Sequence, residues 1–86
     1  MKEIFIECRS FVSRADLHKG IAAAMAFPEW YGNNLDALYD CLTEISGKVR
    51  LLDWEIAENN LGPYGKKAKK VIVTAALRNE DLDLYI

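Results

Sequence analysis

The spacing of hydrophobic positions predicts strands and helices that follow one another along the chain. The short β-prone run Ile4-Phe5-Ile6 predicts a strand over residues 2–7. Ser13, with Asp16 three residues later, resembles the start of a capping box. The apolar spacing that follows predicts a helix over residues 14–26. The positions expected to face the core are Leu17, Ile21, Ala24 and Met25.

A turn over residues 27–34 is predicted to lead into a second helix. Pro28 fixes its own φ and disfavours helix in the residue before it. Gly32 allows a left-handed backbone, and Asn34, or Asn33 one residue earlier, suits the N-cap. The core face of the following helix is expected to consist of Leu35, Leu38, Cys41, Leu42 and Ile45.

The opposite face of this helix, which is expected to end near Gly47, is acidic. It carries Asp36, Asp40, Thr43 and Glu44, with Tyr39 at the border. No Lys or Arg occurs between Gly20 and Gly47, and each like-charge pair at i,i+4 costs the helix about 0.2–0.5 kcal/mol. A solvated polar face is the simpler interpretation, but such a face usually mixes both signs. One sign of charge beside Trp30, Tyr31 and Tyr39 favours a docking surface for a basic partner.

The C-terminal half alternates between strand and helix signals. We expect a strand at Val49–Trp54, one helical turn at Glu55–Asn60, a loop at Leu61–Gly65, a helix over about residues 65–78 and a strand at Leu82–Ile86. The apolar side of the long helix is Ala68, Val71, Ile72, Ala75 and Ala76. Strands separated by helices predict a small α/β fold, a three-stranded parallel sheet packed with three to four helices. The sequence leaves the strand order open.

Composition and length limit the class of protein. The 86 residues, about half of them hydrophobic, predict one domain over residues 1–86 with a modest core. No apolar run is long enough for a membrane span, and the charged N-terminus does not resemble a signal peptide. The two cysteines make no disulfide framework, so we expect reduced thiols and a cytoplasmic protein.

Residues for catalysis or metal binding are sparse. His18 is the one histidine and lies far in sequence from both cysteines, and Cys41 on the core face is expected to be a buried structural thiol. No zinc-ligand spacing is present, and the helical carboxylates Asp36, Asp40 and Glu44 lack the loop that wraps around calcium. We therefore expect no metal, no cofactor and no enzymatic activity.

A basic run balances the acidic middle of the chain and supplies the alternative function. Lys66, Lys67, Lys69 and Lys70 could contact nucleic-acid phosphates. The run has no interleaved aromatic residues for base stacking, which favours an ordinary solvated surface. A nucleic-acid-binding module that uses the Lys66–Lys70 face is the alternative hypothesis.

The central stretch resembles the barstar family, intracellular inhibitors of bacterial ribonucleases. The resemblance is carried by Pro28-Glu29, Tyr31-Gly32, Asn34-Leu35-Asp36-Ala37-Leu38 and Asp40-Cys41-Leu42-Thr43, with weaker support from Asp16-Leu17-His18 and Trp54. It implies a three-stranded parallel sheet packed with helices. It also implies that the protein blocks a ribonuclease active site with an acidic helix that mimics RNA phosphate.

By this resemblance, Asp40 matches the phosphate-mimicking aspartate, Asp36 a neighbouring acidic contact, and Trp30 and Tyr39 an aromatic contact pair. Both aromatic residues differ from the family pattern, where a tyrosine and a tryptophan stand in their places. The partner-binding set is Trp30, Gly32, Asn34, Asp36, Tyr39, Asp40, Thr43 and Glu44.

Two further positions depart from the family. Ala76, or a residue close to it, replaces a family glutamate that contacts the nuclease, and Val49 replaces a proline. The expected partner is a basic ribonuclease, either barnase-like or another ribonuclease toxin, which the protein would neutralise. We expect a monomer when free, with no direct contact to nucleic acid or membrane.

Overall fold

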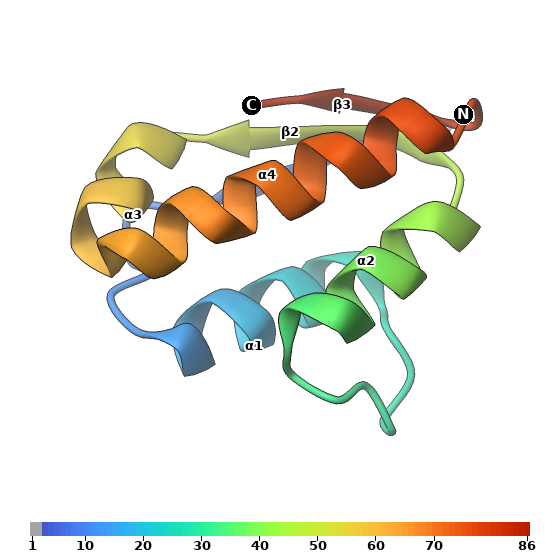
Figure 1. Cartoon of the computed structure of the whole chain (residues 1–86). Helices are drawn as coiled ribbons and strands as arrows, with labels where there is room; N and C mark the ends of the chain where they lie inside the picture. Colours follow the sequence, from blue (N-terminus) through green and yellow to red (C-terminus); the bar gives the residue numbers. More distant parts are fainter. Residues whose placement is uncertain (1–2) are drawn as a thin grey trace.

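A computed structural model describes residues 3–86, which form three parallel strands and four helices (Figure 1). The strands lie side by side in chain order, β1 (Glu3–Glu7), β2 (Gly47–Leu52) and β3 (Leu82–Tyr85). The connections contain α1 (Arg14–Met25) and α2 (Leu35–Glu44) between β1 and β2, and α3 (Trp54–Leu61) and α4 (Pro63–Arg78) between β2 and β3. The α/β class and the parallel sheet predicted from the sequence are confirmed, and the strand order is now defined.

The core lies between one face of the sheet and the helices. Alternate strand residues Ile6, Val49, Leu51 and Leu82 are buried. They pack with Leu17 and Ile21 of α1, Leu38 and Leu42 of α2, and Ile72 of α4. Ala24, which the sequence analysis placed in the core, is exposed, because α1 buries a narrower stripe and Ala22 packs against the core instead.

The other face of the sheet is open, which is uncommon for a parallel sheet. Phe5, Arg50 and Tyr85 are direct neighbours across the three strands on this face. Arg50 Nε lies 2.7 Å from Glu3 Oε2, and its guanidinium carbon lies 4.4 Å from the centre of the Tyr85 ring. Long charged side chains therefore cover part of the exposed aromatic surface.

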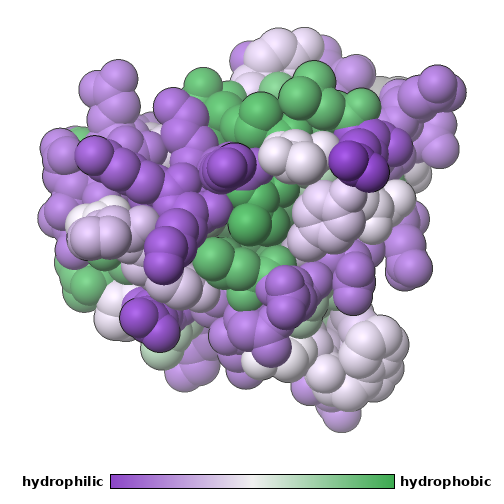
Figure 2. Space-filling view, viewed as in Figure 1, coloured by the Kyte–Doolittle hydropathy of each residue, from purple (hydrophilic) through white to green (hydrophobic). Residues whose placement is uncertain are grey.

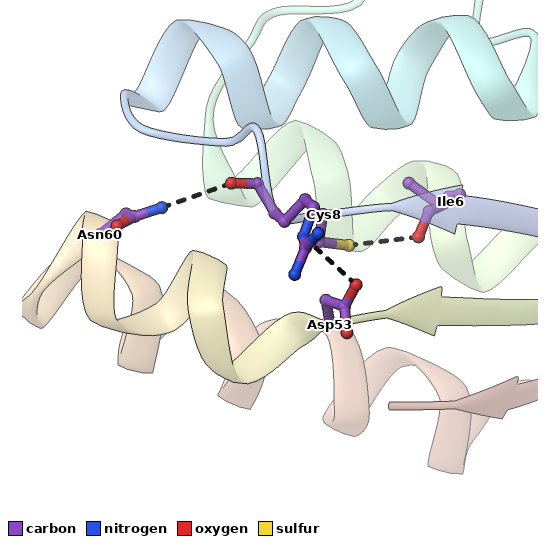
Figure 3. Close-up of polar contacts among 5 residues, drawn as sticks. Ile6, Cys8, Asp53 and Asn60 are labelled. Carbon is purple, nitrogen blue, oxygen red and sulfur yellow. Dashed lines mark hydrogen bonds and ion pairs between the residues drawn. The ribbon is translucent and has the colours of Figure 1, made fainter.

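The second strand ends two residues earlier than predicted. Asp53 adopts a left-handed conformation, with φ 58°, and turns the chain so that Trp54 begins α3. Trp54 is buried and donates its indole N–H to Glu58 Oε1. Figure 3 shows Asp53 beside the segment that follows β1, where its carboxylate lies 3.6 Å from Arg9 Nε.

The predicted loop at Leu61–Gly65 was wrong, because α3 and α4 are nearly continuous. Helix α3 has eight residues rather than one turn, and only Gly62, with φ 63°, separates it from α4. Pro63 begins α4, a position where its missing N–H has no consequence. A Cβ at Gly65 would lie 2.8 Å from Glu58 Cα, so glycine permits the close crossing of the two helices.

The remaining boundaries differ from the predictions by one or two residues. Ala26 takes a left-handed conformation and ends α1 at Met25, and Ile86 lies outside β3. The first predicted strand began at residue 2, which lies outside the described residues. Within residues 3–86, no helix combines the length and the hydropathy that crossing a bilayer requires.

Candidate functional site

The predicted site residues form one continuous surface, made by the loop over residues 27–34 and the outer face of α2. Asp36, Asp40 and Glu44 are exposed along α2, while Tyr39 and Thr43 are partly buried at its borders. Trp30, Gly32 and Asn34 are exposed in the loop that precedes the helix. Figure 1 shows this loop and α2 together at one end of the molecule, away from α3.

The loop holds one aromatic residue inward and presents the next to solvent. Tyr31 is 6% exposed and packs against Phe27, with 5.0 Å between the ring centres. Trp30, its neighbour, is 82% exposed. Tyr31 N–H donates to the carbonyl of Pro28 at 3.0 Å, which closes a tight turn around Trp30. A large aromatic side chain on an anchored turn is a suitable contact residue for a protein partner.

His18 anchors this loop to two helices. Its Nδ1 lies 2.7 Å from the hydroxyl of Tyr31, and its Nε2 lies 2.6 Å from the hydroxyl of Tyr64 on α4. His18 is 1% exposed, and its burial lowers the pKa of the imidazole below the ordinary value. Burial also raises the pKa of the Tyr31 hydroxyl. This arrangement supports a neutral, structural histidine rather than a catalytic one.

Asn34 is the N-cap of α2, one of the two positions that the sequence left open. Its Oδ1 accepts the N–H of Ala37 at 2.8 Å, and its Nδ2 donates to the carbonyl of Gly32 at 3.2 Å. The left-handed residue of this turn is Asn33, with φ 54°, although Gly32 would also allow that conformation. Asparagine tolerates this conformation better than most residues. Gly32 instead lies against Asn34, where an added Cβ would be 3.1 Å from Nδ2.

The C-terminal end of α2 is held by a residue that sequence reasoning missed. Asn79, at the end of α4, donates from Nδ2 to the carbonyls of Leu42 at 2.8 Å and Ile45 at 2.6 Å. The last turn of α2 contains Glu44 and no basic residue. A single buried amide thus satisfies carbonyls that a basic residue or a C-cap often satisfies elsewhere.

The acidic face has no internal counter-charge in the described part of the chain. The ion pairs of residues 3–86 are Arg9–Asp53 and Arg50–Glu3, and neither involves α2. Thr43 stays bonded within the helix, donating to the carbonyl of Asp40 at 2.8 Å. The carboxylates of Asp36 and Asp40 are therefore presented to solvent on a helix fixed at both ends.

The cysteines are unsuited to nucleophilic chemistry. Cys41 is only partly buried, contrary to the expectation of full burial, because its position lies at the edge of the apolar stripe of α2. Burial, and then the nearby carboxylates of Glu44 and Asp40, raise the pKa of the Cys41 thiol. Cys8 is fully buried, and its burial raises the pKa of its thiol to about 12. Residues 3–86 contain no group of three His, Cys, Asp or Glu side chains placed to hold a metal ion.

The sequence analysis did not identify the residues that hold this loop and α2 in place. Tyr31, Tyr64 and Asn79 act over 13 to 46 residues of sequence separation. The single histidine, on the buried side of α1, was a weak indication in the sequence that a buried polar contact exists there. No periodicity marks the tyrosines or Asn79 as its partners.

Two comparisons with known proteins place the chain. The sequence profile of the family described as Barstar (barnase inhibitor) matches residues 1–83. A curated Bacillus subtilis (strain 168) protein named "Putative ribonuclease inhibitor YrdF" is 36% identical over 78 residues, covering 87% of this chain and 86% of that protein. Since both matches span most of the chain and the parallel α/β fold agrees with them, this chain belongs to the barstar family.

Proposed function

We propose that this protein inhibits a basic ribonuclease by placing the acidic face of α2 in the nuclease active site. The observation that carries this proposal is the exposed acidic face itself, which forms no ion pair within residues 3–86 and is presented by a helix whose two ends are fixed by Asn34 and Asn79. Membership of the barstar family supports the ribonuclease as the class of partner. The family is described as one of inhibitors, which supports a binding role for this chain.

The electrostatic argument follows from what a ribonuclease must bind. Its active site holds RNA phosphate with arginine and lysine side chains, and a carboxylate can accept the same charge-assisted hydrogen bonds. Asp40 projects from the middle of α2, and Asp36 lies one turn before it. We assign Asp40 the role of the phosphate mimic and Asp36 that of the neighbouring contact. A complementary pair of charged surfaces also accelerates association.

The charges of the acidic face lower the stability of α2 itself. Asp36–Asp40 and Asp40–Glu44 are like-charge pairs at i,i+4, each unfavourable by about 0.2–0.5 kcal/mol. Glu44 occupies the last turn, where the negative end of the helix dipole disfavours a carboxylate by about 0.3–1 kcal/mol. A helix selected only for stability would avoid this pattern, so a binding role explains it better than solvation does.

Trp30 and Tyr39 complete the proposed docking surface. Trp30 offers an exposed aromatic side chain beside the acidic face, and Tyr39 lies at the border of α2. Gly32 and Asn34 shape the loop between them, while Thr43 and Glu44 extend the surface toward the end of the helix. Aromatic residues at the centre of an interface commonly supply a large share of the binding energy.

The test is Asp40→Ala, measured for both stability and binding. Asp40 is exposed and its removal relieves repulsion with Asp36 and Glu44, so the free energy of unfolding should stay unchanged or rise slightly. In the complex, truncation leaves nuclease cations buried without a partner, and binding should weaken by about 2–5 kcal/mol or more. This range is the one known for buried charge pairs at interfaces such as that of barnase with barstar.

The binding partner for this measurement is a basic ribonuclease encoded in the source cell, used in a catalytically inactivated form. The control is Glu7→Ala, which removes an exposed carboxylate from the open face of the sheet. We expect the control to leave affinity unchanged. If Asp40→Ala unfolds the protein, or binds the nuclease as tightly as the unaltered chain, the phosphate-mimic role is wrong.

A further inference from the structure

Strand β3 forms an edge of the sheet that has no partner strand. In the described residues it pairs only with β2, through Gly47↔Leu82 to Arg50↔Tyr85. Exposed edges are normally protected by lysine, proline, a bulge, a covering segment or a very short strand, and of these devices β3 shows only its short length of four residues. The pairing of β3 runs without a bulge, and Asp83 is the only charged residue of the strand. This edge is therefore open to a further strand.

An apolar groove runs along the same edge. It has a volume of about 330 Å³ and lies between α4 and β3. Its lining is Val73, Ala76, Leu77, Leu82, Leu84 and Ile86, together with Asp83 and Tyr85. Leu77 is 81% exposed, which is unusual for a leucine beside a sheet. Figure 2 shows hydrophobic surface gathered toward the C-terminal half of α4, interrupted by hydrophilic side chains.

We propose that β3 pairs with β3 of a second copy of this chain, antiparallel across a two-fold axis, to form a six-stranded sheet. An axis at Leu84 places the two Leu84 residues opposite each other, Leu82 opposite Ile86, and Asp83 opposite Tyr85. Leu82 and Leu84 lie on the packed face of the sheet, and Ile86 directly follows the strand. Pairing would extend the strand alternation to Ile86, so each apolar residue would meet an apolar residue, which is the self-complementarity that a two-fold interface requires.

Neighbouring registers are less favourable. A shift of the axis to Asp83 brings the two Asp83 carboxylates directly opposite each other, which is destabilising. An axis midway between Asp83 and Leu84 places these two residues opposite each other. The apolar residues of one copy would then lie on the opposite face of the sheet from those of the other copy. The Leu84 register avoids both problems.

Charge complementarity supports a second copy of this chain as the occupant. The guanidinium of Arg50 lies over the ring of Tyr85, and Lys48 Nζ lies 5.8 Å from the centre of that ring. Asp83 of one copy therefore faces a Tyr85 ring beside which Lys48 and the Glu3-paired Arg50 lie, and the symmetry repeats this attraction. Leu77 of each copy gains apolar contact with the end of the other strand. The apolar residues that line the groove of one copy would thus pack against the same residues of the other copy.

The proposed dimer leaves the acidic face of α2 accessible. Helix α4 lies between α2 and β3, so the two surfaces point in different directions (Figure 1). The inference departs from the monomer expected from the sequence. The sequence did not define the strand order, and without it the open edge of β3 could not be recognised.

Sedimentation equilibrium tests the dimer. A contact made by one short strand and one helix side is small, so we expect weak association. The average mass should rise toward twice the monomer mass between about 10 µM and 1 mM. Leu77→Glu should remain monomeric over this range with an unchanged circular dichroism spectrum. Val12→Glu, which places the same charge at another exposed apolar position, should dimerise like the unaltered chain.

A constant monomer mass for the unaltered chain overturns the proposal, as does a Leu77→Glu variant that dimerises as strongly. If the unaltered chain stays monomeric, a strand from another protein is the remaining candidate partner for the edge of β3.

The register is tested by disulfide cross-linking in chains that also carry Cys41→Ala. An equimolar mixture of Asp83→Cys and Tyr85→Cys should form a covalent heterodimer several-fold faster than either variant alone. Directly opposite positions allow a disulfide, whereas the diagonal separation of about 7–8 Å between equal positions exceeds its reach. Equal rates in the mixture and in the separate variants overturn the proposed register.

Discussion

His18 contributes to stability through the hydroxyls that its two ring nitrogens contact. A neutral imidazole donates from one nitrogen and accepts at the other, so it can bond to both Tyr31 and Tyr64. A protonated ring would be a buried cation, and Arg14 lies nearby, with its guanidinium carbon 4.6 Å from the centre of the Tyr64 ring. No carboxylate is bonded to either hydroxyl within the described residues. The neutral form is therefore the one compatible with the fold.

The stability of the protein should consequently depend on His18 in mildly acidic solution. The folded state has a lower pKa for His18 than the ordinary value of 6.5, so the unfolded chain binds the proton more tightly. The free energy of unfolding should be highest above pH 6.5 and fall as the pH drops from there toward the folded-state pKa. His18→Gln should lose this part of the dependence. Urea unfolding of both chains between pH 7.5 and about 5 measures it, and equal slopes would contradict the assignment.

The two tyrosines around His18 are predicted to contribute differently to nuclease inhibition. Tyr31→Phe and Tyr64→Phe each remove one hydroxyl and leave a ring nitrogen of His18 without its partner, so each should cost about 1–3 kcal/mol of stability. Only Tyr31 belongs to the loop that presents Trp30. Nuclease inhibition should therefore weaken more in Tyr31→Phe than in Tyr64→Phe.

Inhibition titrations of the two variants against the same ribonuclease, at a temperature where both are folded, provide the comparison. Equal inhibition by both would show that the hydroxyl of Tyr31 does not position the loop.

At the scale of elements, α2 depends on α4 for its C-terminal end. Asn79→Ala removes two hydrogen bonds and leaves the carbonyls of Leu42 and Ile45 without them. We expect a loss of about 1–3 kcal/mol in the free energy of unfolding. Amide hydrogen exchange in the last turn of α2 should also accelerate more than exchange in α1. The control is Asn59→Ala on α3, an exposed position that should change stability by less than about 0.5 kcal/mol. An equally small effect at Asn79 would contradict this role.

The elements themselves were predictable to the extent that local patterns determine them. The apolar stripe of α2 and the Ser13 cap follow from spacing and side-chain chemistry; the structure confirms the cap and buries Leu38 and Leu42, while the rest of the predicted stripe is partly buried. Spacing left both Asn33 and Asn34 open as the cap of α2, and the structure selects Asn34. The end of β2 did not follow. Trp54 continues the strand pattern of Val49 to Leu52, and only the left-handed backbone of Asp53 turns it into a helix.

The prediction of a loop over residues 61–65 was wrong for a related reason. Glycine and proline normally mark a break, but here Gly65 permits the close crossing of two helices, and Pro63 starts the second of them. The exposed residues of the candidate site could be grouped from the sequence because they lie on one helix and the turn before it. Its anchors His18, Tyr64 and Asn79 could not, because their contacts depend on how distant elements pack.

At the scale of the whole molecule, charge is separated between two surfaces. The acidic face lies on α2, and the exposed lysines at positions 66, 67, 69 and 70 lie on the N-terminal half of α4, beside α3 (Figure 1). The formal net charge of −2 conceals this separation. A basic nuclease approaching α2 is attracted by one surface and repelled by the other. The lysines are therefore expected to slow association slightly rather than to bind the partner.

Replacing Lys66, Lys67, Lys69 and Lys70 with glutamine distinguishes the two candidate functions. Removing four positive charges takes the formal net charge from −2 to −6. For a ribonuclease inhibitor, the association rate with the nuclease should rise at low salt and return to the unaltered value near 1 M salt, where the Debye length is about 3 Å. Dissociation should not change, because these side chains lie outside the proposed interface.

The unaltered protein should bind single-stranded RNA weakly. For a nucleic-acid module, the same change would abolish tight RNA binding, and the affinity before substitution would fall steeply with salt. Stopped-flow association and RNA titration on the two chains decide between these outcomes, and tight, salt-dependent RNA affinity that the glutamines abolish would displace inhibition as the function.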